Sequence, residues 1–198
     1  MGEHLKEVLQ ELEIGPESGP VLALAALLHE VTESEPVPAQ LSSPPYKPSF
    51  SGLGQPAQIA FNIGARLRLP RAESEHLAWL IDHLNAFETI EAWSPAQRKR
   101  LLIHSGRADL ITLFRADAQA DGRSTQPADF CEDYVAHEPE GPIDPPLLLN
   151  GHDLQVLEIA PGPRFKKILE QGRDEQLNGH IHTREEALTW LKDHVRAS

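Results

Sequence analysis

Five side chains on four predicted helices are of the types that bind divalent cations. His4 lies in the first of these helices, His29 and Glu30 end the second, and Asp117 and His83 lie further along the chain. Imidazoles and carboxylates from different helices of a bundle can converge on one ion. Such an ion lowers the pKa of a bound water, so that hydroxide can attack a phosphate ester. The sequence therefore predicts a site for Mn²⁺, Ni²⁺ or Mg²⁺ at His4, His29, Glu30 and Asp117, with His83 as a further candidate.

Each of these residues also fits a role without a metal. The chain has 10 histidines, so a single imidazole is weak support for a ligand. His4 fits an exposed surface, His29 fits a buried or capping residue at the end of an apolar helix, and Asp117 fits a structural hydrogen-bonding role. Only convergence in space distinguishes the two interpretations.

Three cations follow a rigid turn near the C-terminus. In the segment Pro161-Gly162-Pro163-Arg164-Phe165-Lys166-Lys167, the turn leads into a predicted helix whose first N–H groups and dipole favour an anion. Arg164, Lys166 and Lys167 therefore predict a phosphate-binding corner suited to a nucleic-acid backbone. Solvated surface charge is the alternative. Arg66 and Arg68 form a weaker second patch.

Several motifs of known chemistry are absent. The chain has no Gly-rich phosphate loop, no Gly-x-Ser-x-Gly turn and no Cys-His pair in a recognisable setting. Its one cysteine, Cys131, excludes a disulfide framework and a cysteine-based zinc cluster.

The elements that must position these residues are all helical. Apolar spacing and capping signals predict helices, and no stretch shows the alternation of a strand. The predicted helices cover residues 3–13, 18–31, 56–67, 70–84, 94–106, 107–120, 127–135, 150–157, 161–177 and 183–194. Residues 136–149, rich in Pro and Gly, predict a linker. The expected fold is all-α, with a helical domain over residues 1–135 and a small helical tail over 150–198.

Composition and charge narrow the function classes. The chain has 198 residues, 40% of them hydrophobic, and a formal net charge of −12. This excess of acid argues against nucleic-acid binding by bulk attraction, so any such binding needs a local patch. No apolar run has the roughly 20 residues of a membrane span, and the N-terminus lacks a leader pattern. We expect a cytoplasmic protein with no membrane partner.

The segment from Pro145 to Trp190 carries the most specific family resemblance. Its motifs are Asn-Gly-His-Asp-Leu, Ala-Pro-Gly-Pro-Arg-Phe, Gln-Leu-Asn-Gly-His-Ile and Thr-Arg-Glu-Glu-Ala-Leu, in that order. This series resembles the C-terminal segment of bacterial CCA-adding tRNA nucleotidyltransferases and related poly(A) polymerases. The resemblance implies a role in tRNA processing, with tRNA or another RNA as the partner.

The upstream part resembles the HD domain that precedes this segment in many of these proteins. His29-Glu30 looks like its His-Asp motif, His4 lies at the position of the first ligand, and Asp117 at that of the last. Glu30 replaces the family's Asp, and Leu53 stands where the family has a His. Leu53 cannot ligate a metal. The resemblance therefore implies an altered HD-like site of three or four ligands.

Two functions and one further partner are compatible with this pattern. The first is an RNA-binding helical module that does not add nucleotides by itself, because the family's nucleotidyltransferase head has no counterpart here. The second is a metal-dependent HD-type phosphohydrolase acting on a nucleotide or an RNA phosphate. The expected partner besides RNA is a separately encoded nucleotidyltransferase head.

Overall fold

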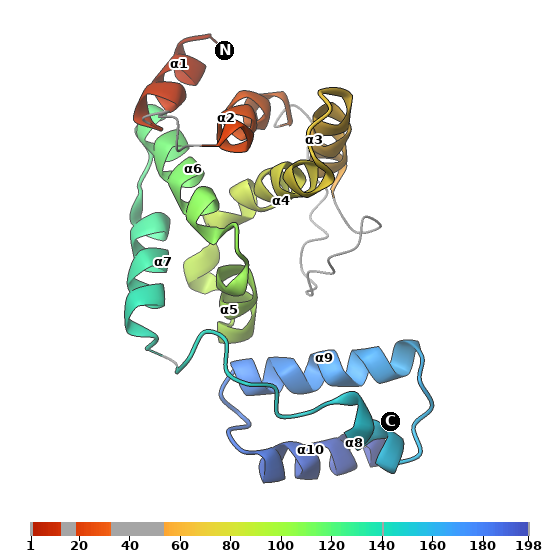
Figure 1. Ribbon diagram of the computed structural model, residues 1–198. Coiled ribbons are helices and arrows are strands. Elements are labelled where there is room, and N and C mark those ends of the chain that lie inside the picture. Colours follow the sequence, from red (N-terminus) through yellow and green to blue (C-terminus); the bar gives the residue numbers. More distant parts are fainter. Residues whose placement is uncertain (1, 13–18, 33–53, 140, 198) are drawn as a thin grey trace. The chain divides into compact units, whose positions relative to one another are not determined.

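The computed structural model describes residues 2–12, 19–32, 54–139 and 141–197, and every regular element in these ranges is helical (Figure 1). The predicted all-α class is confirmed. The helices are α1 (Gly2–Glu11), α2 (Pro20–Thr32), α3 (Gln55–Arg66), α4 (Arg71–Phe87), α5 (Pro95–Ile103), α6 (Arg107–Ala120), α7 (Gln126–His137), α8 (Gly151–Val156), α9 (Pro163–Leu177) and α10 (Arg184–Ala197), with a 3₁₀ turn at Ile90–Ala92.

The chain divides into two compact units that are not continuous in sequence. Unit 1 comprises Met1–Ala92 and His104–Ala136, and unit 2 comprises Trp93–Ile103 and His137–Ser198. The sequence prediction placed α5 in the first domain, whereas its packing places it in unit 2. Arg100 Nε donates to Asp174 Oδ1 on α9 at 2.6 Å, and Ala96 N donates to Asn178 Oδ1 at 2.9 Å. These contacts join residues far apart in sequence, so local patterns carry no sign of them.

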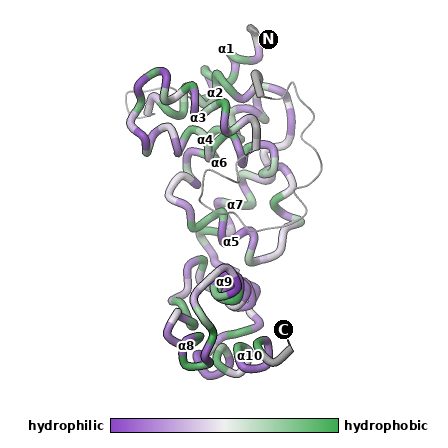
Figure 2. The backbone as a smooth tube through the Cα atoms, turned by 90° about the vertical axis from the view of Figure 1, so that its right-hand side faces the viewer, coloured by the Kyte–Doolittle hydropathy of each residue, from purple (hydrophilic) through white to green (hydrophobic). Residues whose placement is uncertain are grey.

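The core of unit 1 forms where α1, α2, α4 and α6 pack together. The apolar stripe of α4 buries Leu77, Leu80 and Phe87 completely. The ring of Phe87 packs against Phe114 of α6, with 5.0 Å between centroids. Figure 2 shows apolar and polar residues alternating along these helices, as expected for amphipathic helices with one buried face. Burial of these faces packs α1, α2 and α6 against one another, and this packing also brings polar side chains of the three helices together.

Unit 2 packs α8, α9 and α10 around one apolar cluster. Its fully or nearly buried members are Leu149, Leu154, Ile168, Ile181, Ala187 and Leu191. Leu149 lies in the segment predicted as a linker, and this segment is tied to α9 because Arg173 Nη1 donates to the carbonyl oxygen of Pro145 at 2.7 Å.

The capping signals of the sequence are realised in unit 2. Asn150 and Asp153 form a capping box at the start of α8, with Asn150 N donating to Asp153 Oδ2 at 2.8 Å. Thr183 and Glu186 exchange the corresponding bonds at the start of α10, each at 3.2 Å. These boxes satisfy helix N–H groups that would otherwise lack partners, so they define where the two helices begin.

Candidate metal centre

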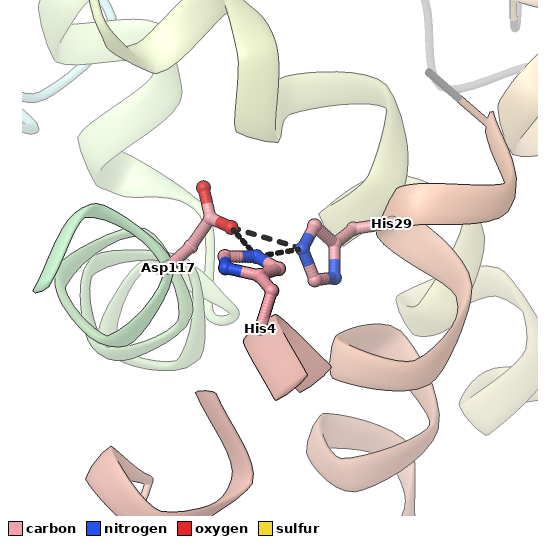
Figure 3. A group of neighbouring side chains, drawn as sticks. All are labelled: His4, His29 and Asp117. Atoms are coloured by element: carbon pink, nitrogen blue, oxygen red, sulfur yellow. Dashed lines mark hydrogen bonds and ion pairs between the residues drawn. The ribbon is translucent and has the colours of Figure 1, made fainter. Parts of the chain in front are cut away.

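Three helices of unit 1 bring His4, His29 and Asp117 together (Figure 3). His4 lies on α1, His29 in the last turn of α2, and Asp117 on α6. α1 packs against both α2 and α6, and α2 also packs against α6, so all three pairs of helices are in contact. We call these three side chains the His/Asp cluster.

The facing atoms of the His/Asp cluster form a small triangle. His4 Nε2 lies 3.3 Å from His29 Nε2 and 3.2 Å from Asp117 Oδ1, and His29 Nε2 lies 2.9 Å from Asp117 Oδ1. The side chains of His29 and Asp117 are only 2% and 6% exposed, and His4 is 20% exposed. The cluster is therefore buried on the side of α2 and α6 and reaches solvent beside His4.

The outer nitrogen of His29 fixes the tautomer of this ring. His29 Nδ1 lies 2.6 Å from the carbonyl oxygen of Ala26, one turn earlier in α2. A carbonyl can only accept, so the proton of the neutral ring sits on Nδ1 and the lone pair of Nε2 points into the triangle. Metal-ligating histidines in proteins have this arrangement.

Asp117 is held as a carboxylate. Burial raises the pKa of its carboxyl group, but the hydrogen bond from His29 in its protonated form and the charges of protonated His29 and Arg123 outweigh burial, so the pKa lies below its ordinary value. Arg123 Nη2 donates to the second oxygen, Oδ2. Asp117 thus presents a charged oxygen to the two imidazoles.

These donors fit a divalent cation. Two imidazole nitrogens and one carboxylate oxygen suit Zn²⁺, Mn²⁺, Fe²⁺ or Ni²⁺. A triangle with these sides has a circumradius of about 1.8 Å, so one point can lie at the usual metal–ligand distance of about 2.1 Å from all three atoms. The alternative to a cation is a proton on His29 Nε2, which would make an ion pair between His29 and Asp117. Within the described residues no other group of three His, Cys, Asp or Glu side chains has this geometry.

His83, a further predicted ligand, does not join the triangle. His83 lies on α4, where its Nδ1 is 2.8 Å from the carbonyl oxygen of Trp79 and its ring stacks on the indole with 4.7 Å between centroids. Glu30 belongs to α2, but its side chain lies outside the described residues, as does Leu53.

Two residues beside the cluster were not predicted from the sequence. Asp121 Oδ1 lies 2.9 Å from His4 Nδ1, and Arg123 contacts both Asp117 and Asp121. The signal that could have pointed to them is Asp-Gly-Arg directly after a predicted helix end, because Gly there reverses the chain toward the helix.

The predicted phosphate-binding residues lie on exposed surfaces of the separate units. Arg164, Lys166 and Lys167 are exposed in the first turn of α9 in unit 2, where Lys166 Nζ lies 3.8 Å from Glu170 Oε1. Arg66 ends α3 in unit 1, and Arg68 follows it with a positive φ of 59°. Both are exposed.

Fold and site together define an all-helical protein with a buried two-histidine, one-carboxylate cluster. The chain is similar to the A-adding tRNA nucleotidyltransferase of Deinococcus radiodurans, with 28% identity over 206 aligned residues. The match covers 96% of this chain and 45% of the relative, so the chain spans just under half of the relative's length. This similarity supports a relationship to the tRNA nucleotidyltransferases. No family model and no solved structure match the chain.

Among the described helices, none combines the length and the apolar character that crossing a membrane requires.

Proposed function

We propose that this protein is a tRNA-binding helical module of cytoplasmic tRNA metabolism. The observation that carries the proposal is the similarity to a tRNA nucleotidyltransferase along 96% of the chain. The proposal assigns no nucleotide addition to these 198 residues. Because they correspond to 45% of the relative, a nucleotidyltransferase head would be a partner for that reaction.

The start of α9 is the surface best suited to the tRNA backbone. Pro163 occupies the first turn and the preceding Gly162 makes no side-chain cap, so first-turn N–H groups face solvent or a ligand. In the described chain, no ion pair involves Arg164 or Lys167. Their charges and the helix dipole act on the same small area, which compensates locally for the net charge of −12.

Fluorescence anisotropy with labelled tRNA at two salt concentrations tests this proposal. The double variant Arg164→Glu with Lys166→Glu should bind at least 10-fold more weakly than the wild type and show a shallower salt dependence, because fewer phosphate-bound counterions are released. The matched control is Lys6→Glu with Lys192→Glu, which makes the same charge change at two exposed lysines elsewhere. Absence of binding at low salt, or equal loss in both double variants, contradicts the proposal.

A metal-dependent phosphohydrolase is the second candidate, and the convergence of the His/Asp cluster favours it. His4, His29 and Asp117 would hold a divalent cation, which when bound supplies Lewis-acid activation of a water nucleophile and of a phosphoryl group. The burial of His29 and Asp117 keeps competing water away from two of the three ligand atoms. The partial exposure of His4 leaves one side of the cluster accessible to a substrate.

Hydrolysis of a 2′,3′-cyclic nucleotide tests the second candidate. The chain is stripped with a chelator and assayed with Mn²⁺, Ni²⁺ or Mg²⁺, alongside His29→Ala and the exposed control His152→Ala. We expect turnover that needs an added metal, is lost in His29→Ala and is kept in His152→Ala. No turnover with any metal, or equal turnover in both variants, excludes this activity for this substrate class.

A further inference from the structure

A second layer of charged residues surrounds the His/Asp cluster. Arg123 donates through Nη2 to Asp117 Oδ2 and through Nε to Asp121 Oδ2, the latter at 3.2 Å. Its third contact, Nη1 to Glu88 Oε1, is 3.4 Å long and lies at the surface. The guanidinium therefore spans two carboxylates of α6 and its C-terminal cap.

Asp121 connects this layer to His4. Its Oδ1 lies 2.9 Å from His4 Nδ1, while its Oδ2 accepts from Arg123. The negative charge of Asp121 favours a proton on His4 Nδ1, which leaves the lone pair of Nε2 facing the triangle. Asp117, Arg123, Asp121 and His4 thus form one connected chain of charged and polar contacts.

The end of α6 explains why Arg123 can reach back. Gly122 has a φ of 64°, Gly122 N donates to Gln119 O at 3.0 Å, and Arg123 N donates to Ala118 O at 2.7 Å. These two bonds make a Schellman motif, which ends the helix and reverses the chain direction. The reversal places the Arg123 side chain beside Asp117, which precedes it by six residues.

With the histidines neutral, the layer also favours a cation. Three carboxylates, from Asp117, Asp121 and Glu88, face a single guanidinium, so the group has a net negative charge of two. A divalent cation in the triangle neutralises this charge. Arg123 meanwhile occupies Oδ2 of Asp117, so that only Oδ1 is available inside the cluster.

We propose that Asp121 and Arg123 are positioning residues for a divalent cation at the His/Asp cluster. Asp121 favours the His4 tautomer in which Nε2 carries the lone pair, and Arg123 occupies one oxygen of Asp117 so that only the other can bind the cation. The inference rests on the metal site of the second candidate function. It adds two residues that do not themselves touch the metal.

Metal titration of the full chain tests the positioning role. Calorimetry with Mn²⁺ should show 10- to 100-fold weaker binding in Asp121→Asn and in Arg123→Lys, because loss of such outer partners commonly costs this much affinity. Lysine keeps the charge of Arg123 but not its two-pronged geometry. Arg115→Lys is the matched control, since Arg115 of α6 makes a similar two-carboxylate contact, to Asp129 and Glu132 of α7, outside the cluster.

A second readout separates positioning from metal binding. In ¹⁵N spectra of the metal-free chain, the wild type should show His4 protonated at Nδ1, and Asp121→Asn should lose this preference while keeping its helical circular dichroism. Unchanged Mn²⁺ affinity in both variants overturns the proposal. If the wild type binds no metal, the proposed metal site is wrong. If the His4 tautomer is also unchanged in Asp121→Asn, then Asp121 does not orient His4 either.

Discussion

Asp117 Oδ1 and His29 Nε2 lie 2.9 Å apart, across the contact between α6 and the last turn of α2. Both atoms carry lone pairs when His29 is neutral with its proton on Nδ1, so they attract each other only through a shared proton or a cation. The fold holds them at this distance by burying both side chains. The two atoms therefore form either an ion pair that shares a proton or a site that binds a metal cation.

Asp117→Asn should destabilise the metal-free chain by about 2 kcal/mol at neutral pH, because the carboxylate no longer accepts charged hydrogen bonds from protonated His29 and from Arg123. The pKa of Asp117 is lowered in the folded chain, so its contribution is present above the ordinary carboxyl pKa and lost as the pH falls through the folded value. Urea unfolding at pH 7 and at pH 3 checks this. The difference between wild type and variant should shrink at the lower pH, and a constant difference contradicts the account.

Gly122→Ala should lower the unfolding free energy by about 1 kcal/mol, since an L side chain is strained at a φ of 64°. Nothing lies within 4 Å of an added Cβ, so the cost is conformational and not steric. Gly122→Asn should cost less, because asparagine tolerates this conformation. Thermal unfolding of the three chains orders them, and an alanine variant as stable as the wild type would show that the Schellman motif is not needed.

Asp153→Ala should destabilise unit 2 by about 2 kcal/mol, because this buried carboxylate takes part in both the helix cap and the ion pair with the half-exposed Arg184. Asp153 Oδ1 accepts from Arg184 Nη2 at 2.5 Å, and Oδ2 accepts from Asn150 N at 2.8 Å. Chemical unfolding followed by Trp190 fluorescence reports the effect. The exposed Asp193→Ala on α10 is the control, and equal stability of the two variants would contradict the prediction.

Acid should destabilise unit 1 through two imidazoles that flank one indole. The rings of His83 and His104 stack on Trp79 with 4.7 Å and 3.9 Å between centroids. Burial lowers the pKa of both, and the charges of His83 and His76 lower that of His104 further. The unfolded chain therefore takes up these protons at a higher pH than the folded chain does, so the free energy of unfolding falls as the pH drops below 6.5.

The pH dependence of His104→Asn checks this assignment. Unfolding free energies measured from pH 7.5 to pH 5 should fall less steeply in the variant than in the wild type. Parallel curves would mean that His104 does not contribute to the acid sensitivity.

Local signals account for most of what the sequence predicted. The apolar stripe of α4 and the capping boxes at Asn150 and Thr183 act within a few residues, so the sequence alone locates these helices. The start of α5 is similar, because Ser94 N donates to Gln97 Oε1 at 3.0 Å. Its membership of unit 2 was not predicted, since it depends on distant partners on α9.

The candidate site also contains some residues that the sequence predicted and others that it did not. His4, His29 and Asp117 were singled out by residue type and by family resemblance, and the packing of three helices brings them together. Asp121 and Arg123 were not singled out, because their positions follow from a glycine turn and from contacts back to α1 and α6. Side-chain roles that arise from a reversal of the chain leave no periodic signal.

Anomalous X-ray scattering from a crystal of the full chain soaked in Mn²⁺ tests the metal centre most directly. The account predicts one strong peak about 2.1 to 2.3 Å from each of His4 Nε2, His29 Nε2 and Asp117 Oδ1. The peak should disappear in Asp117→Asn. A wild-type crystal with no peak among these three atoms, and His29 in direct hydrogen bond with Asp117, would contradict it.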